Sequence, residues 1–152
     1  MSDLPLEPRV EAKIPVSLRR LFGAQAQASR GFLDTRFGRR PHWTVRSPEG
    51  AYLGQAMVDD VPGKSERITI LVATAPDGTL RDLEILAYRE AYGGEVAQEA
   101  WRAQFRGRKA GDPLRVGRQV RNVSGATIST NSVSAGVARC LAALAASGGG
   151  SR

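Results

Sequence analysis

The chain has 152 residues, 41% of them hydrophobic and 24% charged, and a net charge of +7. This length can bury a sizeable core, and the composition is ordinary for one small globular domain. A single cysteine, Cys140, excludes an internal disulfide, and its apolar neighbours predict a buried side chain. With one cysteine and one histidine, His42, the chain has no cluster with the ligand spacing of a zinc or iron–sulfur site.

Membrane and export signals are absent from the sequence as written. No run approaches the roughly 20 apolar residues of a membrane span. The N-terminal region also lacks the apolar centre of a secretory signal. The sequence therefore predicts a soluble chain, and it does not distinguish a cytoplasmic protein from an exported one whose signal has been removed.

Residues 1–41 are predicted to form an N-terminal helix and a loop. Apolar side chains with helical spacing run from Val10 to about Ala28, and Pro15 is expected to break or begin this helix. Gly31 to Pro41 shows little pattern and is typical of a connecting loop. Residues 42–146 then form the main domain, and the Ser- and Gly-rich residues 147–152 form a flexible tail.

Two hairpins are predicted in the first half of the main domain. In each, two runs of strand character flank turn residues, which are Ser47-Pro48-Glu49-Gly50 in the first hairpin and Pro76-Asp77-Gly78 in the second. The four expected strands are 42–46, 51–58, 68–74 and 80–88. Two hairpins imply a mainly antiparallel sheet, with His42 in a loop or at a strand edge.

The second half of the main domain is predicted to add helices. A short helix spans 95–105, a strand spans 114–120, and a C-terminal helix spans 131–146 with an apolar stripe that faces the sheet. Tyr88 and Trp101 are expected in the core. The fold class is therefore α+β: a mainly antiparallel sheet packed by an N-terminal helix, a short middle helix and a C-terminal helix.

The strongest chemical signal lies just before the C-terminal helix, where Ser124-Gly125-Ala126-Thr127 is followed by Ser129 and Thr130. A helix start leaves its first N–H groups unpaired and carries partial positive charge, so a hydroxyl-rich turn with glycine suits a phosphate there. Thr127 would lie where a phosphate can be bound or bonded. Ser and Thr are also the usual N-caps of helices, and chemistry alone favours that second interpretation.

This segment resembles the attachment motif of the FMN-binding domain family, found in subunits of sodium-pumping NADH:quinone oxidoreductase and of Rnf-type electron-transport complexes. The family pattern is Asp-x-x-Ser/Thr-Gly-Ala-Thr, and its last threonine carries FMN through a phosphoester placed by a flavin transferase that uses FAD. The resemblance implies that Thr127 carries the flavin and that Ser124, Gly125 and Ala126 belong to the site. The family's aspartate falls at Arg121, a reversal of charge that leaves covalent and noncovalent FMN both open.

The resemblance covers about Ala51 to Ala146 and includes a loop, 89–95, that lies beside the cofactor in the family. It implies that three residues of this loop approach the isoalloxazine ring: Tyr92, Gly93 and Gly94. Glycine permits close backbone contact, and an aromatic face can stack on the ring. For Glu90, in the same loop, a role at the site and a role at the surface are both open.

Around the phosphate, the resemblance and the local chemistry together imply a set of polar contacts. Backbone N–H groups near Gly125 and Ala126 would solvate the charge together with the hydroxyls of Ser124, Ser129 or Thr130. Arg121 could pair with it. Lys64, in the segment 59–66, could lie over the cofactor, although this segment lacks the spacing of a nucleoside-triphosphate loop.

A basic stretch precedes the motif and supports several interpretations. Seven Arg or Lys side chains fall between Arg102 and Arg121, against Asp112 alone. The first interpretation is a solvated basic face, and the next is attraction to the FMN phosphate or to an acidic redox partner. Nucleic acid comes third, because single-strand recognition also needs aromatic platforms and the stretch has only Trp101 and Phe105 at its start.

The residues and the resemblance together predict an FMN-binding electron-transfer protein, with no catalytic residues and no metal site of its own. The alternatives are a noncovalent FMN oxidoreductase acting on a small molecule and a basic nucleic-acid-binding module whose motif is only a helix cap. The expected partners are a flavin transferase and either redox donor and acceptor proteins or a quinone-linked membrane complex, with nucleic acid unexpected. The resemblance also implies a location outside the cytoplasm or at a membrane.

Overall fold

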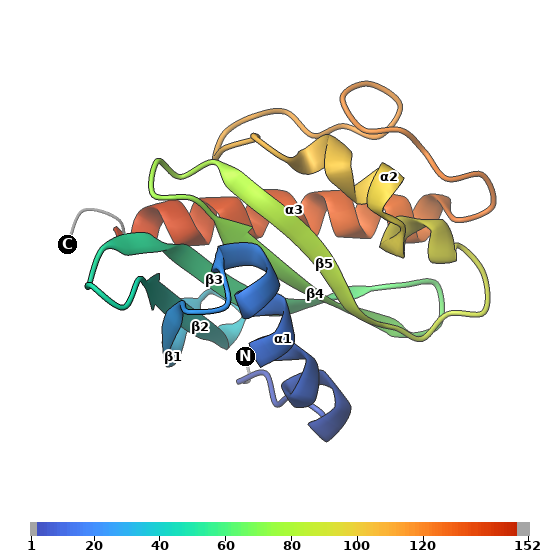
Figure 1. Ribbon diagram of the computed structural model, residues 1–152. Coiled ribbons are helices and arrows are strands. Elements are labelled where there is room, and N and C mark those ends of the chain that lie inside the picture. Colours follow the sequence, from blue (N-terminus) through green and yellow to red (C-terminus); the bar gives the residue numbers. More distant parts are fainter. Residues whose placement is uncertain (1–2, 149–152) are drawn as a thin grey trace.

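The computed structural model describes residues 3–148 and contains a five-stranded antiparallel sheet with helices on both faces (Figure 1). The strands lie side by side in chain order: β1 (Gln27–Thr35), β2 (Gly38–Arg46), β3 (Tyr52–Pro62), β4 (Arg67–Thr74) and β5 (Leu80–Tyr88). One face is covered by α1 (Pro8–Phe22). The other is covered by α3 (Thr127–Ser147) and by the short helices η1 (Gly94–Ala97), α2 (Glu99–Arg102) and η2 (Ala103–Phe105). The predicted α+β class is confirmed.

Two hydrophobic cores lie on the two faces of the sheet, because successive strand residues point to opposite sides. In β4, Ile70 and Val72 pack in the core shared with α3 and α2, whereas Leu71 and Ala73 pack against α1. Both sets are fully buried. Burial on both faces explains why this strand is a nearly continuous apolar run in the sequence.

The helix α1 begins at Pro8, a favourable first helical position, and ends before Gly23, whose φ of 104° leaves the helical region. The prediction that it continues to about Ala28 is wrong. Pro15 lies inside the helix and neither breaks nor begins it. Its exposed ring removes one backbone hydrogen bond, and the buried apolar side of the helix, which includes Ile14 and Leu18, holds the segment together.

The loop predicted at 31–41 is also wrong, because these residues belong to the β1–β2 hairpin. β1 is an edge strand with mostly exposed side chains, so it lacks the apolar alternation that marks a half-buried strand. The pairing of β2 with β3 starts at His42, so Pro41 lies just outside the paired part of β2. The division of the chain between residues 41 and 42 stays a prediction, and this position lies within β2.

The segments after β5 are less regular than predicted. Residues 95–105 form short turns of helix in place of one helix, and 114–120 contains a single bridge between Val116 and Val120 in place of a strand. Pro113 and the turn at Gly117 interrupt extended structure there. The C-terminal helix starts at Thr127, earlier than the predicted residue 131, and ends at Ser147. Residues 149–152 of the predicted tail lie outside the described residues.

Close packing fixes α3 on the sheet. At Gly136 a Cβ atom would lie 2.4 Å from Val61 Cγ1 of β3, so only glycine allows this approach. Cys140, on the same helix, is 1% exposed, as predicted, and burial raises the pKa of its thiol. This packing holds the start of α3, and with it Thr127, in a defined place relative to the sheet.

Candidate functional site

Three segments that are distant in the sequence meet at one end of the sheet: the turn between β3 and β4, the loop after β5, and the start of α3 (Figure 1). Between them lies a hollow of about 490 Å³. Its lining residues are Lys64, Ser65, Glu90, Ala91, Tyr92, Gly125, Ala126, Thr127, Ile128 and Ser129. The hollow therefore brings together the hydroxyl-rich motif, the predicted flavin loop and the lysine expected to lie over the cofactor.

Thr127 is the first residue of α3, and its side chain lies at the exposed rim of this hollow. The residue before the helix is Ala126, and no side chain caps the helix start. The Thr127 hydroxyl instead accepts a hydrogen bond from the amide of Asn122, with Nδ2 and Oγ1 3.3 Å apart. The interpretation of the motif as an ordinary Ser/Thr cap therefore loses its main support, and Asn122, which the sequence did not single out, joins the site.

The other hydroxyls of the motif divide into two groups. Ser124 is exposed, like Thr127. Thr130 is fully buried, where it donates to the Ala126 carbonyl at 2.8 Å and receives the Val123 N–H at 3.4 Å. Ser129 lines the hollow, although only 4% of its surface is exposed. Thr130 thus supports the turn from within, while Ser124 and Thr127 present hydroxyls to solvent.

The loop after β5 is fixed against the motif through Tyr88. The Tyr88 ring packs against the core, as predicted, but its hydroxyl donates to the carbonyl of Tyr92 and lies 3.4 Å from Ser129 Oγ. Gly93 has a φ of 84°, and a Cβ atom there would lie 2.4 Å from Ala126 Cβ. The loop and the motif therefore touch, and Tyr92 is left 83% exposed beside the hollow.

Glu90 joins this loop to the turn between β3 and β4. Its carboxylate accepts the backbone N–H groups of Ser65 at 2.5 Å and Glu66 at 2.8 Å. The hydrogen bond from Glu66 and, after it, the one from Ser65 hold the pKa of Glu90 below its usual value. The nearby charge of Lys64 lowers this pKa further. Glu90 therefore lines the hollow and organises the turn that carries Lys64, and a role toward the flavin stays a prediction.

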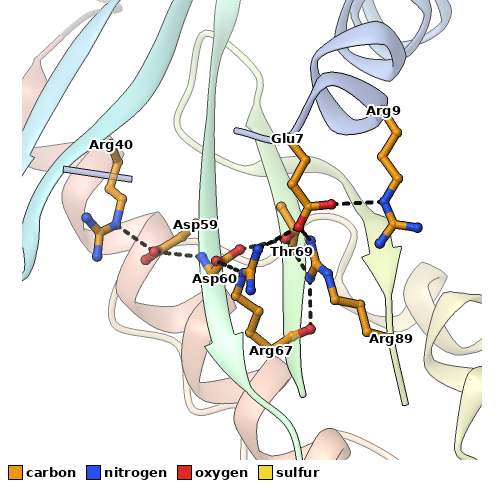
Figure 2. Close-up of polar contacts among 8 residues, drawn as sticks. All are labelled: Glu7, Arg9, Arg40, Asp59, Asp60, Arg67, Thr69 and Arg89. Atoms are coloured by element: carbon orange, nitrogen blue, oxygen red, sulfur yellow. Dashed lines mark hydrogen bonds and ion pairs between the residues drawn. The ribbon is translucent and has the colours of Figure 1, made fainter. Parts of the chain in front are cut away.

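A chain of ion pairs lies behind these loops, from the start of α1 across β4 and β3 (Figure 2). Glu7 Oε1 lies 2.5 Å from Arg67 Nη2 and 2.7 Å from Arg89 Nη2. Arg67 also pairs with Asp60 at 2.9 Å. Arg67 follows the β3–β4 turn that Glu90 holds, and Arg89 directly precedes Glu90. The network therefore supports both the β3–β4 turn and the loop after β5.

Five of the predicted site residues are not among those that line the hollow: Ser124 and Thr130, described above, and Arg121, Gly93 and Gly94. The guanidinium of Arg121 donates to the Ala100 carbonyl of α2 at 2.9 Å, so it points to that helix. Gly93 supports the loop from its contact with Ala126, and Gly94 begins η1. Their predicted contacts with a flavin or its phosphate stay predictions.

Comparison with known proteins identifies the family. The sequence profile of the FMN-binding domain matches residues 63–142. The chain belongs to the FMN-binding domain family. The matched range contains all three segments that form the hollow, and the cofactor of the family is FMN. The comparison with curated proteins gives no match.

A solved structure supports the fold. NqrC of Shewanella oneidensis superposes with a TM-score of 0.53 at 16% sequence identity, over 76% of this chain and 62% of that chain. At this identity the likeness concerns the fold alone.

Among residues 3–148, no helix is long and apolar enough to cross a membrane, and no group of His, Cys, Asp and Glu side chains is arranged to hold a metal ion.

The residues around the hollow fit FMN. The volume of the hollow, about 490 Å³, lies within the roughly 300–1,000 Å³ usual for small-ligand sites. Tyr92 offers an exposed aromatic face for a planar ring system, and Lys64 a positive charge for a phosphate. The start of α3 adds unpaired N–H groups near Thr127. An anionic, aromatic cofactor therefore finds matching chemistry on three sides.

Proposed function

We propose that this protein is an electron-transfer flavoprotein that carries FMN through a phosphoester on Thr127 and relays electrons between redox partners. FMN supplies the chemistry, because it accepts and releases one or two electrons. The observation that supports attachment at Thr127 is the accessibility of its hydroxyl. This hydroxyl lies at the exposed rim of the hollow and does not cap the helix.

The chain's own residues would place and orient the cofactor. Thr127 would hold the phosphate, with the amide of Asn122 positioning the hydroxyl and Lys64 balancing the charge. Tyr92 would cover one face of the ring, held by the hydrogen bond that its carbonyl receives from Tyr88. No further substrate chemistry is required of these side chains, which is why a carrier is favoured over an oxidoreductase with its own small-molecule substrate.

Attachment would require a flavin transferase as partner. In this step the Thr127 oxygen would form a bond to the FMN phosphorus of FAD, the pyrophosphate bond would break, AMP would leave, and the hydroxyl proton would pass to a base of the transferase. The expected redox partners are donor and acceptor proteins or a quinone-linked membrane complex. This assembly would place the chain at a membrane surface or outside the cytoplasm.

The test is the intact mass of the chain under denaturing conditions after co-expression with a flavin transferase. We expect a gain of one FMN less one water, and no gain for Thr127→Ala. Trypsin should place the added mass in the peptide 122–139, which begins after Arg121 and ends at Arg139. Ser124→Ala is the matched control, since it removes the other exposed hydroxyl of the motif and should keep the gain.

Two results would contradict parts of this proposal. Yellow protein that loses its colour on denaturation, with unchanged mass, would show noncovalent FMN and would point to Arg121 at the family's Asp position as the cause. Colourless protein of unchanged mass would overturn the flavin proposal for this chain as a whole.

A further inference from the structure

The segment between η2 and the motif, residues 108–121, is rich in positive charge, and we call it the basic loop. It contains five cations against the carboxylate of Asp112: Arg108, Lys109, Arg115, Arg118 and Arg121. Four of these side chains are exposed, and Arg108 is half-buried. Five cations against one carboxylate give this short loop a formal charge of +4.

The cations of the basic loop differ from most other arginines in how they are paired. Arg40, Arg67, Arg89 and Arg106 all contact carboxylates elsewhere in the fold. Within residues 3–148, no ion pair involves a cation of the basic loop. Arg108 and Arg121 donate to backbone carbonyls of Gln104 and Ala100. The charges of Lys109, Arg115 and Arg118 are consequently available to a partner.

The backbone of the basic loop is held in place by contacts with the core and with α3. Leu114 packs against the core and its carbonyl accepts the hydroxyl of Ser134 on α3. At the far end, Val120 is buried, and the Arg121 carbonyl accepts the indole N–H of Trp101 at 2.8 Å. A rigid backbone with exposed cations is a preformed binding surface, which reduces the entropy lost on association.

The basic loop also lies beside the proposed flavin site. Ser134, which binds Leu114, is seven residues after Thr127 on the same helix, a rise of roughly 10 Å along α3. The loop leads directly into Asn122, whose amide contacts the Thr127 hydroxyl. Two exposed apolar side chains, Tyr92 and Ile128, line the hollow next to it. An apolar centre beside a charged margin is the usual anatomy of a protein interface.

Other polyanions fit this surface less well. Trp101 and Phe105, the aromatic residues nearest the basic loop in sequence, are 4% and 0% exposed. The exposed Tyr92 is a single ring, so the surface lacks the row of aromatic platforms on which successive bases stack. Among the described residues of the loop, no large apolar side chain is exposed that could enter a lipid surface. The surface thus provides charge on a fixed backbone, which suits steering and brief docking of another protein.

We propose that the basic loop is the docking surface for an acidic one-electron carrier protein that exchanges electrons with FMN at the neighbouring site. This inference rests on the proposed function. Two carriers, each oxidised by one electron, would reduce one FMN to FMNH2 with two protons taken from solvent. Charge complementarity would raise the association rate at low salt, and a small interface would let the carrier leave after each transfer.

The experiment uses FMN-loaded protein and a reduced plant-type [2Fe–2S] ferredoxin, an acidic protein, as the probe. Stopped-flow absorbance gives the second-order rate of flavin reduction at several salt concentrations. We expect Arg115→Glu with Arg118→Glu to lower this rate about tenfold or more at low salt and to abolish most of its salt dependence. Arg19→Glu with Arg36→Glu is the control, because it makes the same change in net charge at exposed positions outside the basic loop.

The outcomes separate the docking proposal from the proposed function. Flavin absorbance and photochemical reduction report whether FMN is bound and redox-active, and wild type without flavin would overturn both. Full flavin with equal rates for the loop and control variants would overturn docking alone. Binding of phosphatidylglycerol vesicles or single-stranded DNA that the loop variant loses, with an unchanged ferredoxin rate, would assign the surface to those polyanions and also overturn the proposal.

Discussion

The carboxylate of Glu7 and the guanidinium of Arg89 lie 2.7 Å apart, although 82 positions separate them in the sequence. Glu7 directly precedes α1, and Arg89 directly precedes Glu90 in the flavin loop. The contact therefore connects a helix on one face of the sheet to the loop that borders the hollow. The same carboxylate also pairs with Arg67, so one residue braces two neighbouring loops (Figure 2).

Glu7→Gln should lower the Tm and speed amide hydrogen exchange in the 63–66 turn and in the 89–93 loop. The neutral amide keeps the size of the side chain but removes the charge that Arg67 and Arg89 share. The control is Asp34→Asn, since Asp34 is 88% exposed and its ion pair with Arg39 spans 3.5 Å at the surface. Equal shifts for the two variants would show that the Glu7 network does not brace the loops.

Acid should loosen the contact between Glu90 and the β3–β4 turn. The backbone N–H groups of Glu66 and Ser65 lower the pKa of Glu90 in the folded protein. The stability contributed by the ionised Glu90 carboxylate is therefore complete above the ordinary glutamate pKa of about 4.3. It is lost as the pH falls through the lower pKa that Glu90 has in the folded protein. Hydrogen exchange of the Ser65 and Glu66 amides should rise in that range. Glu90→Gln should remove this pH dependence, whereas Glu49→Gln, at an exposed turn, should keep it.

Gly93→Ala should destabilise the protein more than Gly78→Ala. Both glycines have positive φ, 84° and 89°, so alanine costs about 1–2 kcal/mol of backbone strain at either position. At Gly78 nothing lies within 4 Å of the new Cβ atom, whereas at Gly93 it meets Ala126 and the Tyr88 hydroxyl. This clash should add about 1–3 kcal/mol. Urea unfolding of the two variants measures the difference, and equal losses would contradict the close contact of loop and motif.

Tyr88→Phe should weaken FMN binding by about fivefold, the equivalent of roughly 1 kcal/mol for one hydrogen bond. The change deletes the hydroxyl that holds the Tyr92 carbonyl but keeps the ring against the core. Fluorescence titration with FMN in a Thr127→Ala background measures the noncovalent affinity. Tyr52→Phe on β3 is the control and should leave the affinity unchanged. A similar loss for both would argue against a specific role of Tyr88.

Local signals made part of this structure predictable. The β4–β5 hairpin has continuous apolar runs around a Pro-Asp-Gly turn, and the Ser124–Thr127 motif is short and contiguous, so both could be located from neighbouring residues. β1 was missed because an exposed edge strand carries no alternating pattern. Asn122 was missed because its contact depends on the turn at Gly125, and Glu7 because its partners lie on distant strands.

Cys140 gives the protein an intrinsic reporter of its own opening. It is the single cysteine of the chain, it lies 1% exposed on α3 facing the sheet, and burial raises the pKa of its thiol. A thiol reagent reacts with the thiolate, so separation of α3 from the sheet, which exposes Cys140 to solvent, should raise its modification rate. Because Thr127 begins the same helix, the modification rate with and without flavin would measure how strongly the cofactor holds that helix closed.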